Sequence, residues 1–409
     1  MNRIILIGNG FDLAHDIETS YSQFLSDYWK NTIEGICSSN DSSVYENDQM
    51  IIQRCPLGIK RDFDFKTLDA YIAEHRGRLK FKNSFLRHIS RTQNLNSWVD
   101  IENEYYELLN NYSITDGKEL RNKQVSKLNK EFREVQDLLE KYLDKKVTEK
   151  NLNNNHHYSI GEKIYNEFSF DDFTEKGKYQ LVREYKGNLI GNITKEIIDD
   201  NKENQILSRI KNRRDNKSIC DFLNVPKFRN SIDLKPSSIL FLNFNYTSTY
   251  RLYFSDHIPL NAGYTGLDYA VVNIHGEILN KQNPIIFGYG DELDEKYKLL
   301  EKTNENSLLE NIKSIKYLET SNYKKLLEYI ESDLYQVCIM GHSCGTSDRT
   351  LLNTLFEHDN CQSIKFFYHK KENGDDNYSD TIRNISRNFN NKVVMRDRVV
   401  NKKYCEPLL

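Results

Sequence analysis

The sequence predicts an α/β fold in which a mostly parallel sheet, flanked by helices, is interrupted by a large helical insertion. Three observations support this prediction. The chain has 409 residues, more than one compact core usually needs, so an insertion or a second domain is expected. Several short runs are continuously apolar, which is typical of strands covered on both faces. A long polar stretch with helical periodicity separates the first such run from the others.

Seven apolar runs are the predicted strands. The first lies at the N-terminus and the others follow residue 235, which predicts a split domain of residues 1–59 and 231–409 around an insertion of residues 60–230. The runs are Ile4–Ile7, Ile239–Leu242, Ala270–Ile274, Ile285–Phe287, Val337–Met340, Ile364–Tyr368 and Val393–Met395.

Four apolar patterns predict helices in the intervening stretch. Ser20, followed three residues later by Gln23, forms a capping box, and the apolar residues after it fall on one helical face. The patterns cover Tyr21–Trp29, Ile101–Tyr112, Val125–Tyr142 and Tyr179–Ile198. Asp100 and Glu102 lie in a predicted first helical turn, where we interpret them as acids that complement the helix dipole.

Charged residues nearly cancel, with 57 basic and 60 acidic side chains and a net charge of -3. This balance argues against nucleic acid or an anionic membrane as the partner. The seven cysteines include no C-x-x-C spacing, which argues against a disulfide framework and a zinc ribbon, so no metal is expected. The first apolar run is too short for a signal peptide, and no stretch approaches the about 20 apolar residues that span a bilayer. A cytoplasmic protein is therefore expected.

Four of the predicted strands end in unusual polar loops. In open parallel sheets, ligands bind just beyond the carboxyl ends of the strands. The coincidence of four such loops predicts that their Gly, Asn, His and Ser residues surround one crevice. The loops are Gly8-Asn9-Gly10-Phe11-Asp12, Asn243-Phe244-Asn245-Tyr246-Thr247, His275-Gly276 and Gly341-His342-Ser343.

Each loop also has a purely structural interpretation. A glycine after a strand lets backbone N–H groups approach a phosphate, but Gly8-x-Gly10 is only half of a dinucleotide motif and also suits a plain turn. Asn243 and Asn245 suit a ribose hydroxyl or a water, or else they cap a helix. His275 is a candidate general base or a structural histidine, and Gly276 beside it would let a substrate approach.

The segment Gly341–Gly345 fits the G-x-S-x-G pattern of a nucleophile elbow, with Ser343 as the nucleophile. An α/β-hydrolase needs a later acid and a later histidine. The chain offers only His358 and His369, with little sequence left for the remaining elements. The pair His156-His157 has no carboxylate or cysteine pattern around it, which indicates a surface loop and not a metal site.

Taken together, these segments resemble the bacteriophage abortive-infection AbiH family, which implies a role in bacterial defence against phage. The matching segments lie in the same order along nearly the whole chain. They are 4–15 (IILIGNGFDLAH), 19–24 (TSYSQF), 98–102 (WVDIE), 241–247 (FLNFNYT), 274–276 (IHG), 286–290 (IFGYG) and 341–348 (GHSCGTSD).

The order of the motifs is also similar, more distantly, to SIR2-like bacterial defence proteins that bind NAD and in many cases hydrolyse it. This resemblance implies a Rossmann-like fold in which His275 and Asn245 are the catalytic residues. The cofactor contacts it implies, together with the neighbouring loop residues, are Gly8, Asn9, Gly10, Phe11, Asp12, Asn243, Thr247, Gly276, Gly341, Ser343 and Asp348.

The chain departs from the SIR2-like pattern at several places. Asn9 and Phe11-Asp12 replace the alanine and small residues that are usual there, and Thr247 replaces the usual acid. No four-cysteine zinc module is present in the sequence, which argues against a protein deacylase.

The function predicted from the sequence is hydrolysis of NAD to nicotinamide and ADP-ribose, without a metal, during phage defence. The expected partners are NAD or a related nucleotide, a phage-derived trigger and a second copy of the chain. Three alternatives remain: a defence sensor that binds a nucleotide without turnover, an α/β-hydrolase-like enzyme using Ser343, and a ribonuclease-type toxin. The basic cluster at Arg209–Arg214 is the sole sequence feature that favours the last of these.

Overall fold

The computed structural model describes residues 1–39, 43–92, 98–150, 156–183, 234–254 and 267–409. Its centre is a parallel sheet whose strand order is β6-β5-β1-β7-β8. This arrangement confirms the predicted Rossmann-like α/β fold. The strands are β1 (Asn2–Ile7), β5 (Ser238–Asn243), β6 (Asp268–Asn273), β7 (Tyr335–Met340) and β8 (Cys361–Phe367).

The strand order places β1 in the middle of the sheet. From β1 the chain adds β5 and then β6 on one side, and it afterwards crosses over to add β7 and β8 on the other side. The direction of winding therefore reverses between β1 and β7. In open α/β sheets such a switch point opens a crevice at the carboxyl ends of the strands, where ligands bind.

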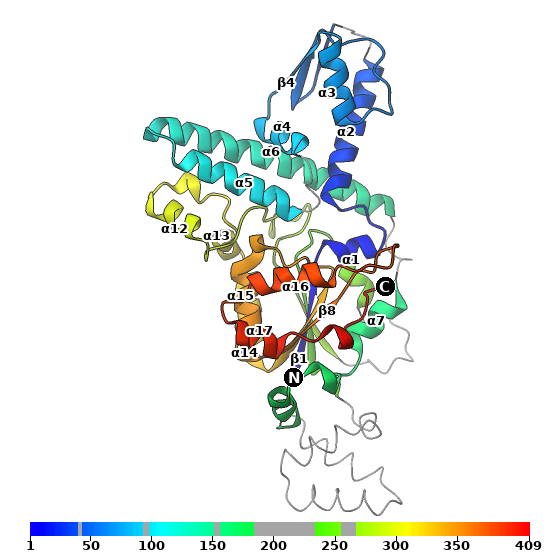
Figure 1. The fold of residues 1–409 in the computed structure, drawn as a ribbon, viewed down its shortest axis with the longest axis vertical. Helices are drawn as coiled ribbons and strands as arrows, with labels where there is room; N and C mark the ends of the chain where they lie inside the picture. Colours follow the sequence, from blue (N-terminus) through cyan, green and yellow to red (C-terminus); the bar gives the residue numbers. More distant parts are fainter. Residues whose placement is uncertain (40–42, 93–97, 151–155, 184–233, 255–266) are drawn as a thin grey trace, which may run out of the picture.

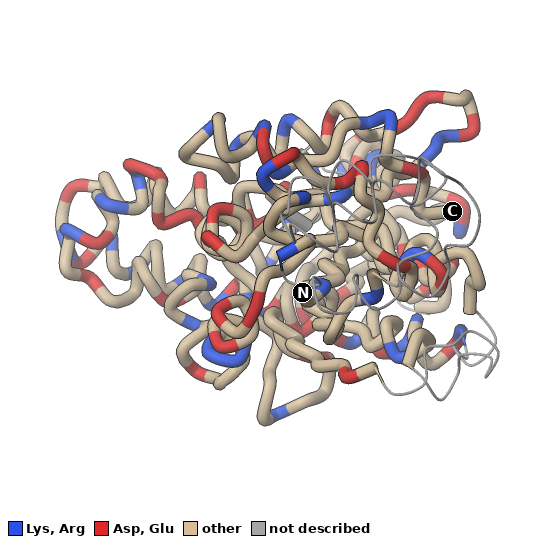
Figure 2. The backbone as a smooth tube through the Cα atoms, turned by 90° about the horizontal axis from the view of Figure 1, so that it is seen from below, with Lys and Arg blue, Asp and Glu red and all other residues tan. Residues whose placement is uncertain are grey.

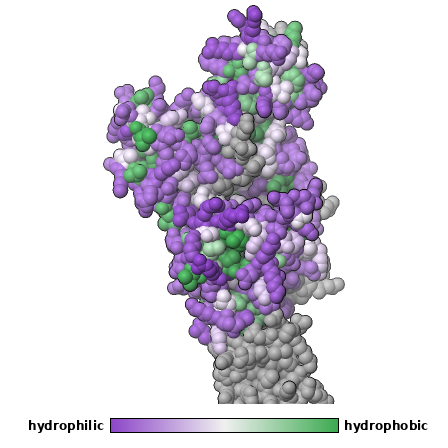
Figure 3. Space-filling view, viewed as in Figure 1, coloured by the Kyte–Doolittle hydropathy of each residue, from purple (hydrophilic) through white to green (hydrophobic). Residues whose placement is uncertain are grey.

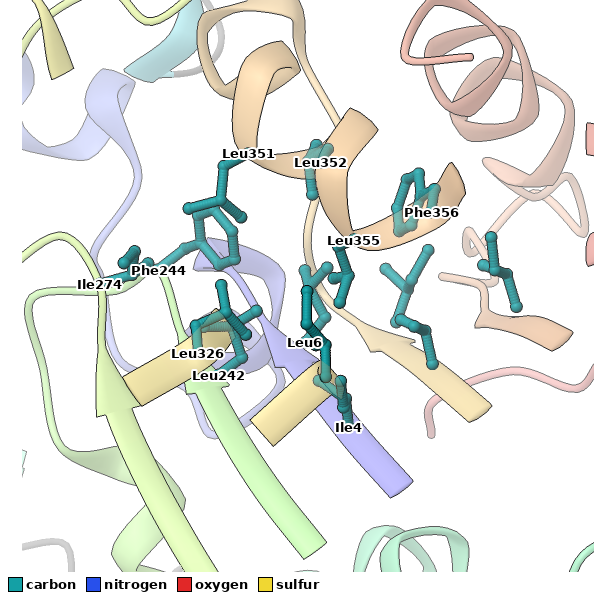
Figure 4. Packing of buried hydrophobic residues seen from close by; sticks show 14 of the residues in the cluster. Ile4, Leu6, Leu242, Phe244, Ile274, Leu326, Leu351, Leu352, Leu355 and Phe356 are labelled. Atoms are coloured by element: carbon teal, nitrogen blue, oxygen red, sulfur yellow. The ribbon is translucent and has the colours of Figure 1, made fainter. Parts of the chain in front are cut away.

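Alternate residues of the strands face opposite sides of the sheet, as the two-residue period of a strand requires. Ile4 and Leu6 of β1 pack with residues of α14 (Asn322–Ser332) and α15 (Arg349–Glu357) on one face (Figure 4). Ile5 and Ile7 pack on the other face against buried side chains of α1 (Asn9–Ala14) and α7 (Tyr158–Tyr165). Because both faces are covered, the central strand β1 is continuously apolar from Ile4 to Ile7.

A layer of long helices packs against the carboxyl edge of the sheet (Figure 1). The predicted capping box is confirmed at the N-terminus of α2 (Tyr21–Ser38), the first helix of this layer. Gln23 N donates to Ser20 Oγ over 3.3 Å, and Ser20 N donates to Gln23 Oε1 over 2.9 Å. The ring of Phe132 stacks on Phe287 with a centroid distance of 4.6 Å, which joins this layer to the chain after β6. The layer contains α2 (Tyr21–Ser38), α4 (Ser84–Arg91), α5 (Trp98–Ser113) and α6 (Lys118–Lys150).

Beyond the helical layer lies a small antiparallel sheet that the sequence did not predict. It pairs β2 (Val44–Glu46), β3 (Met50–Gln53) and β4 (Arg78–Phe81), and α3 (Phe65–Glu74) packs beside it. Trp29 of α2 is buried in the same apolar cluster, so α2 extends from the sheet domain to this sheet (Figure 1).

Two of the predicted strands are wrong. Ile285–Phe287 is buried but not a strand, because its apolar side chains fill two neighbouring clusters while Ile286 N donates to the carbonyl of His275. Val393–Met395 lies in α17 (Lys392–Arg398), because the side chain of Asn391 caps the first turn of a helix there.

Three other sequence features complete the comparison. His156 and His157 lie in an irregular segment before α7, as predicted, but they are half-buried, and the ring of His157 is 5.1 Å from that of His15. The pattern Tyr179–Ile198 is helical up to residue 183, and its remainder lies outside the described residues. The basic cluster at Arg209–Arg214 lies outside them entirely.

Charges of both signs are interspersed over the described part of the chain (Figure 2). Lys and Arg alternate with Asp and Glu along the chain (Figure 2), and the face shown in Figure 3 is mostly hydrophilic with scattered apolar patches. Among the helices of the described ranges, none combines the length and the apolar composition needed to cross a bilayer.

Candidate active site

Three of the four predicted loops touch one another at the switch point. Gly8 N donates to the carbonyl of Met340 over 3.2 Å, and Gly10 N donates to that of Gly341 over 2.8 Å. From the loop after β5, Asn245 Nδ2 donates to the carbonyl of Gly8 over 3.0 Å. The loops after β1, β5 and β7 thus form one hydrogen-bonded edge.

A cavity of about 260 Å³ opens at this edge, and the fourth loop contributes His275 to it. Ten residues predicted from the sequence line the cavity: Gly8, Asn9, Gly10, Asp12, Asn245, Thr247, His275, Gly341, Ser343 and Asp348. The structure therefore brings together most of the predicted site.

The three other predicted contacts, Phe11, Asn243 and Gly276, do not line the cavity but pack next to residues that do. Phe11 packs against His15 with ring centroids 4.7 Å apart. Asn243 Nδ2 donates to the carbonyls of Asn245 and Thr247 over 3.0 and 2.9 Å and so shapes their loop. Gly276 has φ +82°, and a Cβ there would lie 2.0 Å from the carbonyl oxygen of Pro284. Backbone packing therefore requires a glycine at position 276, and the predicted role of Gly276 in admitting a substrate does not explain it.

The same kind of close packing explains the glycines after β1 and β7. Gly341 has φ +78°, and a Cβ there would lie 2.1 Å from the backbone nitrogen of Phe11. The N–H of Gly10 in the first turn of α1 is already bonded to Gly341 O. One amide that would otherwise face a phosphate is therefore used by the protein itself.

Gly341→Ala is expected to destabilise the fold by about 1–3 kcal/mol more than Gly374→Ala. Both glycines have positive φ, +78° and +88°, but nothing lies within 4 Å of a Cβ at Gly374. The difference between the two variants, measured by urea unfolding, isolates the contact between the loops. If both variants lost the same free energy of unfolding, the close contact between the loops after β1 and β7 would not contribute to stability.

A buried ion triad lies beside the cavity. Lys313 Nζ, from α13 (Lys313–Lys316), is 2.8 Å from Glu102 Oε1 and 2.8 Å from Asp348 Oδ1. Glu102 comes from α5, and Asp348 comes from the 3₁₀ turn Thr346–Asp348 after β7. All three side chains are at least 95% buried. The helical layer thus supplies one charged group to the site of the sheet domain.

Burial and the charge of Lys313 shift the pKa values of the two acids of this triad in opposite directions. Burial, assisted by the charge of Asp348, raises the pKa of Glu102 to about 7 against the attraction of Lys313. Burial also acts to raise the pKa of Asp348, but Lys313 and the hydrogen bond from His275 hold it well below its ordinary value. At neutral pH Asp348 is therefore ionised.

His275 is held by two groups at one ring nitrogen. Its Nε2 is 3.2 Å from Asp348 Oδ1 and 3.1 Å from the hydroxyl of Tyr317. Burial, with a contribution from the charge of Lys313, lowers the pKa of His275 to about 4, so the ring is neutral at physiological pH. Since Asp348 is ionised, we assign the single ring proton to Nε2, which leaves the lone pair on Nδ1.

Asp12 is the third buried acid of the cavity. Its Oδ2 accepts a hydrogen bond from Thr247 Oγ1 over 2.6 Å, whereas its Oδ1 has no hydrogen-bond partner among the described residues. Burial raises the pKa of Asp12 to about 6, and the hydrogen bond from Thr247 partly opposes this shift.

The geometry gives the nucleophile-elbow interpretation little support. Ser343 is exposed and lies beyond the carboxyl end of β7. His358, the first histidine after it, stacks on Tyr335, which is the first residue of β7 and lies at the opposite end of that strand. That histidine therefore lies too far away to activate Ser343.

Sequence reasoning missed Lys313 and misinterpreted Glu102. Glu102 was expected to complement a helix dipole, but it is only 3% exposed and pairs with Lys313. Lys313 follows none of the predicted strands, so it could not be found by looking for polar residues at the carboxyl ends of strands. His342 was predicted only as a member of its loop, but its Nε2 lies 3.5 Å from Asp348 Oδ2.

The model of the family described as Bacteriophage abortive infection AbiH matches residues 4–370. The chain belongs to the AbiH family. This confirms the resemblance seen in the sequence and gives the protein a role in abortive infection, a form of defence against phage. The matched range runs from within β1 to beyond β8 and includes the helical layer and every cavity residue named above, so the site is part of the AbiH unit itself. Searches of curated proteins and of solved structures found no match to this AbiH chain.

Proposed function

We propose that this AbiH protein hydrolyses NAD to nicotinamide and ADP-ribose in the cavity at the switch point. One observation carries the proposal: Asn245 and the His275–Asp348 pair line a single cavity at the carboxyl edge of a parallel sheet. The resemblance of the motif order to SIR2-like proteins supports the same reaction. Loss of NAD arrests metabolism, which suits a protein that aborts an infection.

The reaction breaks the bond between C1′ of the ribose and the ring nitrogen of nicotinamide. Positive charge develops on the ribose as the neutral nicotinamide leaves, as in other glycosidic cleavages. A water molecule adds to C1′ and loses a proton to Nδ1 of His275, and the proton then passes to solvent. Asp348 holds the ring orientation and the Nε2 proton, which is the role of an orienting carboxylate in other catalytic pairs.

Asn245 is the proposed partner of the ribose or of the attacking water. Its Nδ2 is bonded to the carbonyl of Gly8, which fixes the amide and directs its Oδ1 as an acceptor. The cavity of about 260 Å³ lies just below the usual size of small-molecule pockets, about 300–1,000 Å³. It therefore suits the nicotinamide–ribose half of NAD better than the whole dinucleotide.

The purified full chain, incubated with NAD, is expected to release nicotinamide and ADP-ribose in equal amounts, as followed by liquid chromatography. Tight NAD binding without any product would contradict this function and favour a nucleotide-binding sensor. The low pKa of His275, about 4, is the observation that favours the sensor, because such a weak base has little tendency to accept a proton.

A further inference from the structure

The carboxylate of Asp12 lines the cavity, but the proposed reaction does not use it. Asp12 is 1% exposed, and Thr247 holds one of its oxygens over 2.6 Å. The other oxygen, Oδ1, is buried without a hydrogen-bond partner in the described part of the chain. A buried carboxylate oxygen is costly to leave unpaired, so its presence at a cavity points to a ligand.

No cation of the described residues neutralises Asp12. Lys313 is the cation that lines the cavity, and it is engaged by Glu102 and Asp348. His275 is neutral, because burial lowers its pKa to about 4. When Asp12 is ionised, the cavity therefore holds more negative than positive charge.

This excess charge selects the kind of group that enters the cavity. A phosphate would face three carboxylates and one lysine that is already paired, whereas a positively charged ring would meet a complementary field. The oxidised nicotinamide ring carries such a charge, and its reduced form is neutral and of almost the same size.

We propose that the cavity recognises ribosylpyridinium compounds, nucleosides whose base is positively charged, and that Oδ1 of Asp12 is the recognition group. This inference rests on the proposed function and adds its substrate class. Asp12 faces the positive charge of the bound ribosyl–nicotinamide unit, and Thr247 holds the carboxylate in place. Asp12 is therefore a specificity residue, and it is distinct from the proton acceptor His275.

Recognition requires the ionised form of Asp12 and depends on pH accordingly. Burial raises the pKa of Asp12 to about 6, so the preference for a cation is present above pH 6 and is lost as the pH falls through this value. The groups that contribute to its environment are Thr19, Asn245, Thr247 and Thr249, and the titratable groups that share its cavity are Glu102, His275, Lys313, His342 and Asp348.

The test compares binding of carba-NAD, whose cyclopentane ring prevents hydrolysis, with binding of its reduced form, whose nicotinamide ring is neutral. By calorimetry at pH 8, the full chain is expected to bind the oxidised form about tenfold more tightly, because of the attraction between the ring's positive charge and the carboxylate of Asp12. The ratio is expected to approach one at pH 5. Asp12→Asn is expected to bring the ratio to about one at both pH values, since it removes the charge.

Asp16→Asn is the matched control, because Asp16 follows the same helix but is 81% exposed on its side chain. It is expected to keep the wild-type ratio. Thr247→Val is the second variant if Asp12→Asn fails to fold. It removes the hydrogen bond that lowers the pKa of Asp12, so the pH at which the ratio falls is expected to rise.

The outcomes separate this inference from the proposed function. Equal binding of the two forms by a chain that hydrolyses NAD would overturn the inference and leave the function intact. A preference for the oxidised form that Asp12→Asn abolishes would support the inference even if NAD is not hydrolysed. A preference that survives in Asp12→Asn would overturn the assignment of Asp12.

Discussion

His275→Ala is expected to lower kcat for NAD hydrolysis by about 100- to 10,000-fold, the usual contribution of a general acid–base group. KM should change much less, since the ring is proposed to accept a proton and not to hold NAD. The measurement is the rate of nicotinamide release at saturating NAD. His275→Gln tests the same role with a side chain that fills more of the space.

The control for this variant is His369→Ala. His369 lies just past the end of β8 at the same edge of the sheet, but it is exposed. It should keep the wild-type rate. Full turnover by both His275 variants, with thermal unfolding showing that they are folded, would refute the assignment. Asn245→Ala is expected to lower the rate as well, and its bond to Gly8 makes a parallel stability measurement necessary.

Lys313→Met is expected to destabilise the protein by about 3–5 kcal/mol at pH 8, because it leaves two buried carboxylates without their cation. Without the lysine, the pKa values of Glu102 and Asp348 should both rise. A buried acid with a raised pKa destabilises the fold as the pH rises through that value. The loss relative to the wild type should therefore shrink as the pH falls from the raised pKa of Glu102 in the variant towards 7, the pKa of Glu102 in the intact triad, and shrink further below 7 as Asp348 of the variant takes up a proton.

Lys296→Met provides a matched control for Lys313→Met. Lys296 also pairs with a glutamate of α5, Glu107, over 2.9 Å, but the two side chains are 51% and 56% exposed. Its loss should cost about 0–1 kcal/mol. Urea unfolding at pH 8 and pH 6 compares the loss of unfolding free energy in the two variants. If the two losses were alike, the triad would not contribute more than an exposed pair.

The sheet domain was predictable because burial on both faces leaves a direct mark in the sequence. Continuous apolar runs such as Ile4–Ile7 were correct for this reason. Ile285–Phe287 has the same composition, but it is buried between two clusters without pairing with a strand. In β4, the alternation of Arg78, Leu79, Lys80 and Phe81 follows the two-residue period, but four residues are too few for a pattern search to single them out.

The site was predictable where its residues follow strands and unpredictable elsewhere. Asp12, Asn245 and His275 lie at strand ends, and one rule about parallel sheets brings them together. Glu102 and Lys313 are 211 residues apart and meet only because α5 packs over the carboxyl edge of the sheet. Periodicity describes a helix face but not the distant residue that this face will contact.

Because Glu102 belongs to the helical layer while Lys313 and Asp348 belong to the chain around the sheet, the triad is complete only when both regions are present. A chimera that takes its sheet from one relative and its helical layer from another must restore an acid at position 102. Otherwise the lysine keeps only half of its counter-charge. Recombination between AbiH sequences should therefore be tolerated least in the segment that begins at Trp98 and ends at Asp348.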